Sequence, residues 1–190
     1  MARASHCPQC GAALIPPRVR GEGPWNTGWR QGLDPKEQFI KYGKDHEADV
    51  RCPCGTIVEL QYGPLSALQI AERERIYGAM VWLFYAVEAH VGQRLRLGLR
   101  PGRDLVNFHW RSPRTTIGAC QRTYYLDLGE SASADGLHLL LEPRTTYPRA
   151  GRVLVGNGLL YTAEAFHNWM AHGIALTPWT PTEGGADLAA

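Results

Sequence analysis

The spacing of hydrophobic and polar positions changes along this chain, and each spacing predicts a different element. Residues 56–62 alternate with period two, which is typical of a half-buried strand. Ser66 and Gln69 then form the pattern of a capping box and predict a long helix that runs to about Val91. Because residues 77–91 are apolar almost all round but shorter than the roughly 20 apolar residues of a membrane span, we expect them to be a buried core helix.

Farther along, the pattern returns to period two and predicts four or five antiparallel strands. Residues 106–110, 124–128 and 137–142 alternate, the last less cleanly. Two short apolar runs flank Gly156-Asn157-Gly158, which is a strong hairpin signal.

A C-terminal helix is predicted over residues 163–172. Thr162 is its expected N-cap and Gly173 its C′ residue, and the buried side chains should be Phe166, Trp169 and Met170.

Together these elements predict an α+β fold in three parts. We expect a zinc-ribbon-like module over residues 1–63, an α+β domain over residues 64–176 and an extended or disordered tail over residues 177–190. In the second part, the long buried helix packs on an antiparallel sheet with the C-terminal helix. The module carries an inserted short helix, because Asp34-Pro35-Lys36-Glu37 supplies an N-cap, a proline at N1 and a glutamate at N3.

Two cysteine pairs carry the strongest chemical signal. Cys7-Pro8-Gln9-Cys10-Gly11 and Cys52-Pro53-Cys54-Gly55 each place two thiols on a tight turn. Four thiolates in a tetrahedron form a closed structural zinc site. The first pair resembles a zinc-ribbon knuckle and the second a shortened one, so the resemblance, which covers about residues 6–62, implies structural Zn²⁺ held by Cys7, Cys10, Cys52 and Cys54.

Other ligand sets remain open for these cysteines. His6 or His46 could replace one thiol, and an iron–sulfur cluster also takes four cysteines. The spacer between the pairs is 41 residues, longer than in compact four-cysteine sites, so it must fold by itself. No export signal precedes the pairs, which favours a reducing cytoplasmic setting. Cys120 stands alone and is expected to be a small buried residue.

The formal charge of +2 averages unlike segments. Residues 1–93 hold ten basic and ten acidic side chains, residues 94–152 hold ten and five, and residues 153–190 hold none and three. The most basic segment faces only Asp104 and carries seven arginines: Arg94, Arg96, Arg100, Arg103, Arg111, Arg114 and Arg122. Such a block predicts binding to nucleic-acid phosphates, RNA or DNA, with Trp110, Tyr124 or Tyr125 available for stacking.

Motifs of known enzyme classes are missing from the sequence: it has no phosphate loop and no nucleophile elbow. The enzyme alternative with most content is a metal-independent nuclease that uses His109 and His138 with Arg111 and Arg114. We favour a non-catalytic, zinc-containing accessory subunit that binds nucleic acid. A third hypothesis is a structural or assembly subunit of a multiprotein complex or viral particle, docking through residues 14–50, where Trp25 and Trp29 lie.

Overall fold

The computed structural model describes residues 23–181 except residues 45, 101, 132 and 133. The chain divides into two units, Met1–Gln31 and Gly32–Ala190. In the described part of the first unit, Pro24–Arg30 forms the short helix α1, which begins at a proline in its first turn. All the other helices and strands, from residue 35 onward, belong to the second unit.

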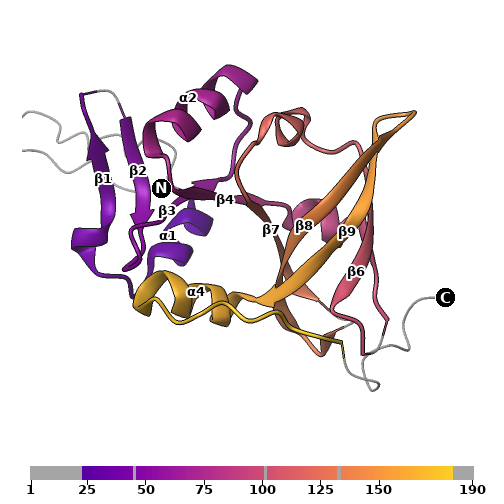
Figure 1. The fold of residues 1–190 in the computed structure, drawn as a ribbon. Helices are drawn as coiled ribbons and strands as arrows, with labels where there is room; N and C mark the ends of the chain where they lie inside the picture. Colours follow the sequence, from indigo (N-terminus) through magenta and orange to yellow (C-terminus); the bar gives the residue numbers. More distant parts are fainter. Residues whose placement is uncertain (1–22, 45, 101, 132–133, 182–190) are drawn as a thin grey trace, which may run out of the picture. The chain divides into compact units, whose positions relative to one another are not determined.

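The second unit is built on one sheet (Figure 1). Its elements in chain order are η1 (Pro35–Glu37), β1 (Gln38–Tyr42), β2 (His46–Arg51), β3 (Ile57–Gln61), α2 (Ala67–Tyr77), β4 (Met80–Tyr85), α3 (Val87–Val91), β5 (Leu95–Gly98), β6 (Leu105–Arg111), η2 (Thr115–Ala119), β7 (Tyr124–Ser131), β8 (Leu137–Arg149), β9 (Val153–Thr162) and α4 (Ala163–His172). The strand order is β1-β2-β3-β4-β7-β8-β9-β6-β5. The α+β class is therefore confirmed.

The sheet is mixed, and the prediction of an antiparallel sheet was wrong for its centre. β4 pairs in parallel with both β3 and β7, whereas the other neighbours are antiparallel. Parallel neighbours need a crossover connection, and α2 supplies the one between β3 and β4. The sheet runs without interruption across residue 63, where a module boundary was expected. Within the described residues no zinc-ribbon module is seen.

The predicted long helix is two helices separated by a strand. The capping box is present, because the Gln69 amide donates to Ser66 Oγ (3.2 Å) and the Ser66 amide donates to Gln69 Oε1 (2.9 Å). However, α2 ends at Tyr77, before Gly78 with φ 67°, and the next apolar residues form β4. A parallel strand buried on both faces reads as a continuous apolar run, which periodicity alone does not separate from a buried helix.

The predicted hairpin at Gly156-Asn157-Gly158 is also wrong, because β9 continues straight through these residues. A Cβ on Gly156 would overlap the Thr145 carbonyl oxygen and lie 2.9 Å from the Phe108 ring. The glycine is there because neighbouring strands approach closely, where a β-carbon does not fit.

The two shorter predicted helices have different outcomes. The Asp34 cap is present, since its Oδ1 accepts from the Lys36 amide (2.9 Å), but only the 3₁₀ turn η1 follows and the chain then enters β1. The C-terminal helix α4 is confirmed with its Thr162 cap and with Gly173 in the left-handed conformation. Phe166 and Met170 are buried as expected, whereas Trp169 is only half-buried.

Helices lie on both faces of the sheet. One core cluster joins side chains of α2, the α3 segment and η2 to strand residues that include Trp82, Phe84 and Leu126. On the opposite face, Phe166 of α4 packs against Tyr125, whose ring also contacts Tyr161. Among the described residues, no helix has both the length and the apolar character needed to cross a membrane.

Candidate nucleic-acid interface

The neighbouring strands β5, β6, β9 and β8 bring together arginines that are far apart in the sequence. These arginines lie where β6 and β8 end. Arg111 at the end of β6 lies opposite Val153 of β9, and Val153 in turn lies opposite Arg149 of β8. The Arg111 amide donates to the Arg94 carbonyl (2.7 Å). The β8–β9 connection joins this end through Arg152, whose carbonyl accepts from the Ser112 amide (2.8 Å).

We call this group the arginine end and define it by five exposed residues: Arg94, Arg96, Arg111, Arg149 and Arg152. Within the described chain, none of these guanidinium groups pairs with a carboxylate. Two of them are oriented by one backbone carbonyl, because Gln93 O accepts from Arg96 Nε (3.1 Å) and from Arg111 (3.4 Å). The arginine end therefore presents positive charge that the described residues leave available to an anion.

The outer face of the same strands carries an exposed ring beside this charge. In one row across β5, β6, β9 and β8, Arg96 lies opposite His109, His109 opposite Val155, and Val155 opposite Tyr147. Tyr147 is 56% exposed. A planar ring next to arginines is the arrangement on which unpaired bases stack.

The aromatic residues that the sequence suggested for stacking are not on this surface. Trp110 is 2% exposed and Tyr125 is 7% exposed, and Tyr124 packs partly buried against the core. The expectation was therefore wrong for Trp110 and Tyr125, because inward-facing positions of the strands hold these large rings. Tyr147 was missed because Pro148 follows it and the alternation of β8 is broken by a bulge between Pro143 and Thr145.

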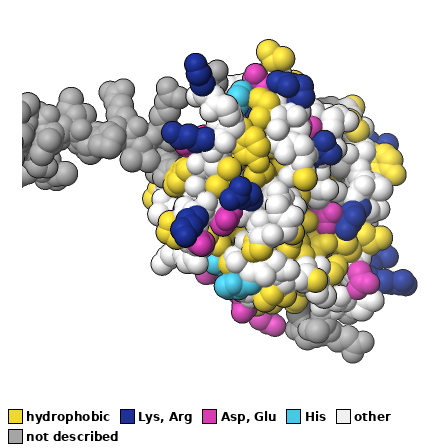
Figure 2. Space-filling model, turned by 60° about the vertical axis from the view of Figure 1, so that its left-hand side comes forward, with side chains coloured by type: hydrophobic (Ala, Val, Ile, Leu, Met, Phe, Trp, Pro, Cys, Tyr) yellow, Lys and Arg dark blue, Asp and Glu magenta, His cyan; other side chains and the backbone are white. Residues whose placement is uncertain are grey.

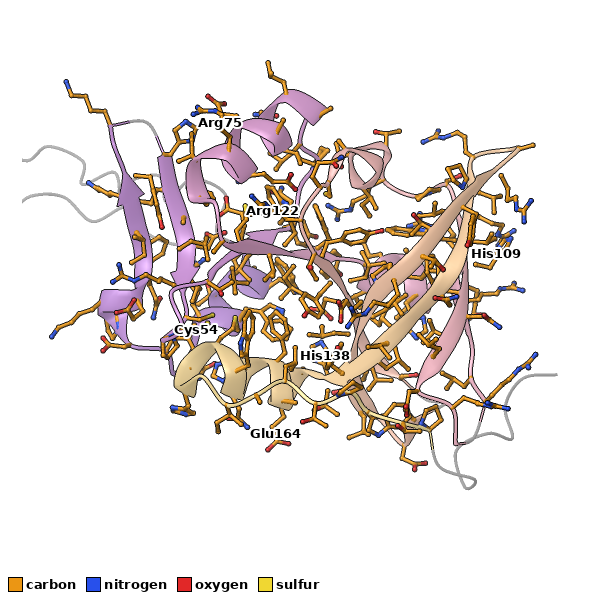
Figure 3. The ribbon with its side chains drawn as sticks, viewed as in Figure 1. Cys54, Arg75, His109, Arg122, His138 and Glu164 are labelled. Atoms are coloured by element: carbon orange, nitrogen blue, oxygen red, sulfur yellow. The ribbon has the colours of Figure 1, made fainter. Side chains whose placement is uncertain are left out.

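Three of the seven predicted arginines lie elsewhere. Arg100 and Arg103 follow β5, where the Gly102 amide donates to the Pro181 carbonyl (3.1 Å), at the opposite end of β6. The Arg122 amide donates to Glu74 of α2 (3.1 Å), and Figure 3 places its side chain toward Arg75 and away from His109. The connections around β6 therefore carry these three side chains away from the arginine end, and phosphate binding by Arg100, Arg103 and Arg122 stays a prediction.

Arg114 lies near the arginine end but is used to hold the fold. Its two terminal nitrogens donate to the carbonyls of Gly63 (3.0 Å) and Tyr85 (2.7 Å). Burial lowers the pKa of this guanidinium from its usual range. We therefore assign Arg114 a structural role between the β3–α2 connection and β4.

Arg149 and Arg152 lie outside the predicted segment, although a signal for them existed. The basic excess of the sequence extends to residue 152, beyond the densest block. What sequence reasoning could not supply was the register that sets β8 and β9 beside β6.

The two histidines of the nuclease alternative do not share a site. β9 separates β6 from β8, and His109 shares its row with Tyr147, far along β8 from His138. Figure 3 shows the two imidazoles on separate parts of the sheet. The fold therefore does not bring together the two histidines that the nuclease alternative needs as acid and base.

His138 instead pairs with a buried carboxylate. Its Nε2 lies 2.6 Å from Oδ1 of the fully buried Asp127, which also accepts from the Gly129 amide (2.9 Å). The hydrogen bond to Asp127 raises the pKa of His138 from its ordinary value. The pair lies at the bulge between Asp127 and Gly129 and secures β8 to β7 there.

Two carboxylates on the α2 side of the sheet are buried and have hydrogen-bond or ion-pair partners, in contrast to the arginines of the arginine end. Glu74 accepts from Trp82 Nε1 (3.0 Å) and from the amides of Gln121 (3.0 Å) and Arg122 (3.1 Å). Glu59 is paired with Arg73. Figure 2, which turns the β1–β2 side of Figure 1 forward, shows basic and acidic side chains interspersed there.

The described half of the predicted zinc site is a tight turn between β2 and β3. The Cys52 amide donates to the Thr56 carbonyl (2.9 Å), the Gly55 amide donates to the Cys52 carbonyl (2.8 Å), and Gly55 has φ 84°. Burial, with Cys54 nearby, raises the pKa of Cys52 to about 12. Cys54 is exposed, and its pKa is lowered by the Thr56 hydroxyl.

Of the other residues proposed as metal ligands, the structure describes only His46. Cys7, Cys10 and His6 lie outside the described residues, and the His46 Nε2 lies 3.6 Å from Glu72 Oε1. Among residues the structure describes, no three His, Cys, Asp or Glu side chains are grouped so that they could hold a metal ion. Cys120 is partly buried, and burial raises the pKa of its thiol to about 12.

Comparison of the chain with family models, with curated proteins and with solved structures finds no match.

Proposed function

We propose that this chain is a non-catalytic nucleic-acid-binding protein that acts as an accessory subunit and contacts phosphates through the arginine end. The observation that carries the proposal is the register of β5, β6, β9 and β8, which gathers five exposed arginines beside Tyr147. Guanidinium groups bind phosphate oxygens bidentately, and arginine does so better than lysine.

The width of the four β-strands suits a nucleic-acid strand that runs across them. Neighbouring strands lie about 4.8 Å apart, so β5 to β8 spans about 15 Å, enough for several successive phosphates. Tyr147 supplies a face for an unpaired base, and the polar pair Asn107 and Asn157 lies in the next row of the same face. These features favour a single strand over a duplex.

Binding of labelled single-stranded and duplex nucleic acid to the full chain tests this proposal. The logarithm of the affinity for the single strand should fall linearly with the logarithm of salt concentration, by about 0.7 for each phosphate contacted. Nucleic acid that co-purifies and is removed by nuclease would add support. A weak affinity that does not change with salt would refute the proposal.

We also propose that Cys7, Cys10, Cys52 and Cys54 hold one structural Zn²⁺. Two of these thiols share the turn described above, where Gly55 takes the positive φ that such a turn requires. A closed four-thiolate site would order its surroundings and catalyse nothing. Metal analysis of the purified chain should give about one zinc per chain, and Cys7→Ser should lose it; a zinc-free wild-type protein would refute this ligation.

A further inference from the structure

A cavity of about 370 Å³ opens beside the arginine end. Its walls come from three distant segments: residues 113–118 around η2, Tyr124 of β7, and residues 146–154 of the β8–β9 pair. The volume lies within the range of small-molecule sites, about 300–1,000 Å³.

The walls combine apolar residues with Thr115 and Thr146, and the charged side chains among them are all basic. Ile117 and Leu154 extend the core cluster into the cavity, Pro113 and Pro148 add apolar surface, and Tyr124 adds a planar aromatic ring. Arg149 and Arg152 are exposed, Arg114 lines the cavity but is partly buried, and the lining contains no carboxylate. A ligand that matches both parts has an uncharged planar body and an anionic group.

The backbone at the edge is held in an uncommon conformation. Arg152 has φ 57° and Ser112 has φ 51°, and the Ser112 amide donates to the Arg152 carbonyl (2.8 Å). Non-glycine residues in this region cost free energy and concentrate at ligand sites. Here the strained pair fixes Arg152 where the cavity opens.

We propose that this cavity binds one nucleotide, with the base between the apolar walls and the phosphate on Arg149 and Arg152. The inference rests on the proposed function to the extent that the nucleotide is part of a bound strand. An inorganic anion alone would leave the apolar walls uncovered, and a purely apolar ligand would leave the two guanidinium groups without a partner in the site. The nucleotide is either a free monophosphate or a residue of a strand.

Gly118 offers a clean way to block the cavity. It lines the wall, and a Cβ added there would have nothing within 4 Å. Gly118→Phe should fill the space without disturbing the backbone, and Gly118→Ala is the matched control that should leave it open. Arg152→Gly removes the guanidinium while keeping the positive φ, because glycine adopts that conformation freely.

Titration calorimetry of the full chain with nucleoside monophosphates, the corresponding nucleosides, inorganic phosphate and a single-stranded oligonucleotide is the experiment. We expect a monophosphate to bind more tightly than its nucleoside or phosphate alone. Gly118→Phe should weaken it at least about tenfold, Gly118→Ala should not, and Arg152→Gly should weaken the monophosphate about tenfold but not the nucleoside.

The outcomes separate this inference from the proposed function. If monophosphates bind and the oligonucleotide does not, the cavity takes a free nucleotide and the proposed function fails. If the oligonucleotide binds, monophosphates do not, and Gly118→Phe leaves oligonucleotide affinity unchanged, the proposed function stands and this inference is overturned. If only the oligonucleotide binds and Gly118→Phe weakens it, the cavity takes a nucleotide of the strand.

Discussion

Charged side chains serve different purposes in two regions of the sheet. Under α2, Glu74 and Glu59 are buried and surrounded by donors from other elements. At the arginine end, Arg111 and Arg149 are exposed and bind no carboxylate of the described chain. A buried charge must be paired and hydrogen-bonded or it destabilises the fold, whereas an exposed guanidinium costs little and keeps its donors for a ligand. Mutation should therefore affect stability in the first region and binding in the second.

The largest effect on stability should come from Glu74→Ala. The change leaves the Trp82 Nε1 donor and two backbone amides without their acceptor, so the free energy of unfolding should fall by about 3 kcal/mol. Urea denaturation measures it. Glu72→Ala on the same helix removes only an exposed side chain 3.6 Å from His46 and should change stability by less than about 0.5 kcal/mol. Equal effects would contradict the contrast within α2.

Gly156→Ala should destabilise the protein by about 2 kcal/mol, because a β-carbon there meets the Thr145 carbonyl and the Phe108 ring. This variant tests whether β9 is a continuous strand at the arginine end. Gly118→Ala is the control, since its β-carbon meets nothing within 4 Å. A Gly156→Ala variant as stable as the wild type would contradict the close approach of β8 and β9 at this residue.

Arg149→Gln should separate binding from stability. We expect stability within about 0.5 kcal/mol of wild type, since Arg149 is exposed, and an affinity for single-stranded nucleic acid about fivefold lower. Arg73→Gln should do the reverse: it removes the partner of the buried Glu59 and lowers stability while leaving affinity unchanged. An Arg73→Gln variant that binds more weakly at full stability would erase the distinction between the regions.

The smallest effect concerns pH and comes from His138, whose pKa is raised from its ordinary value of 6.5 by the hydrogen bond to Asp127. Because the folded state holds this proton more tightly than the unfolded state does, the contribution to stability is lost as pH rises above 6.5. Stability should fall by less than about 1 kcal/mol from pH 6.5 to 8.5 through His138, because its side chain is 40% exposed.

Thermal unfolding between pH 5 and 9 checks this expectation. The melting temperature should decline with rising pH, and His138→Gln should flatten the upper part of the decline. A melting temperature that rises above pH 6.5 would show that His138 does not hold its extra proton in the fold.

Local signals in the sequence predicted some elements well. The Thr162 cap and Gly173 define α4, and the alternation of residues 106–110 falls within β6, in which Val106, Phe108 and Trp110 face inward. These features depend on neighbours within one element, which is what periodicity and capping report.

Features that depend on distant strands were not predicted. β4 is apolar on both faces because it lies between two parallel strands, and Gly156 is required by Thr145 and Phe108 on the neighbouring strands. The arginine end has the same origin, because Arg149 joins Arg111 only through Val153 of β9. The sequence predicted a basic segment, and pairing between strands decides which of its side chains meet.

Two variants of equal charge change test the central claim most directly. Arg96, Arg111 and Arg149, replaced together by Gln, remove three residues of the arginine end, and the same change at Arg100, Arg103 and Arg122 removes three exposed arginines that the structure places elsewhere. Single-strand affinity measured across salt should show a slope reduced by about 2 in the first variant and nearly wild-type in the second. Equal reductions in both variants, or none in either, would contradict the account.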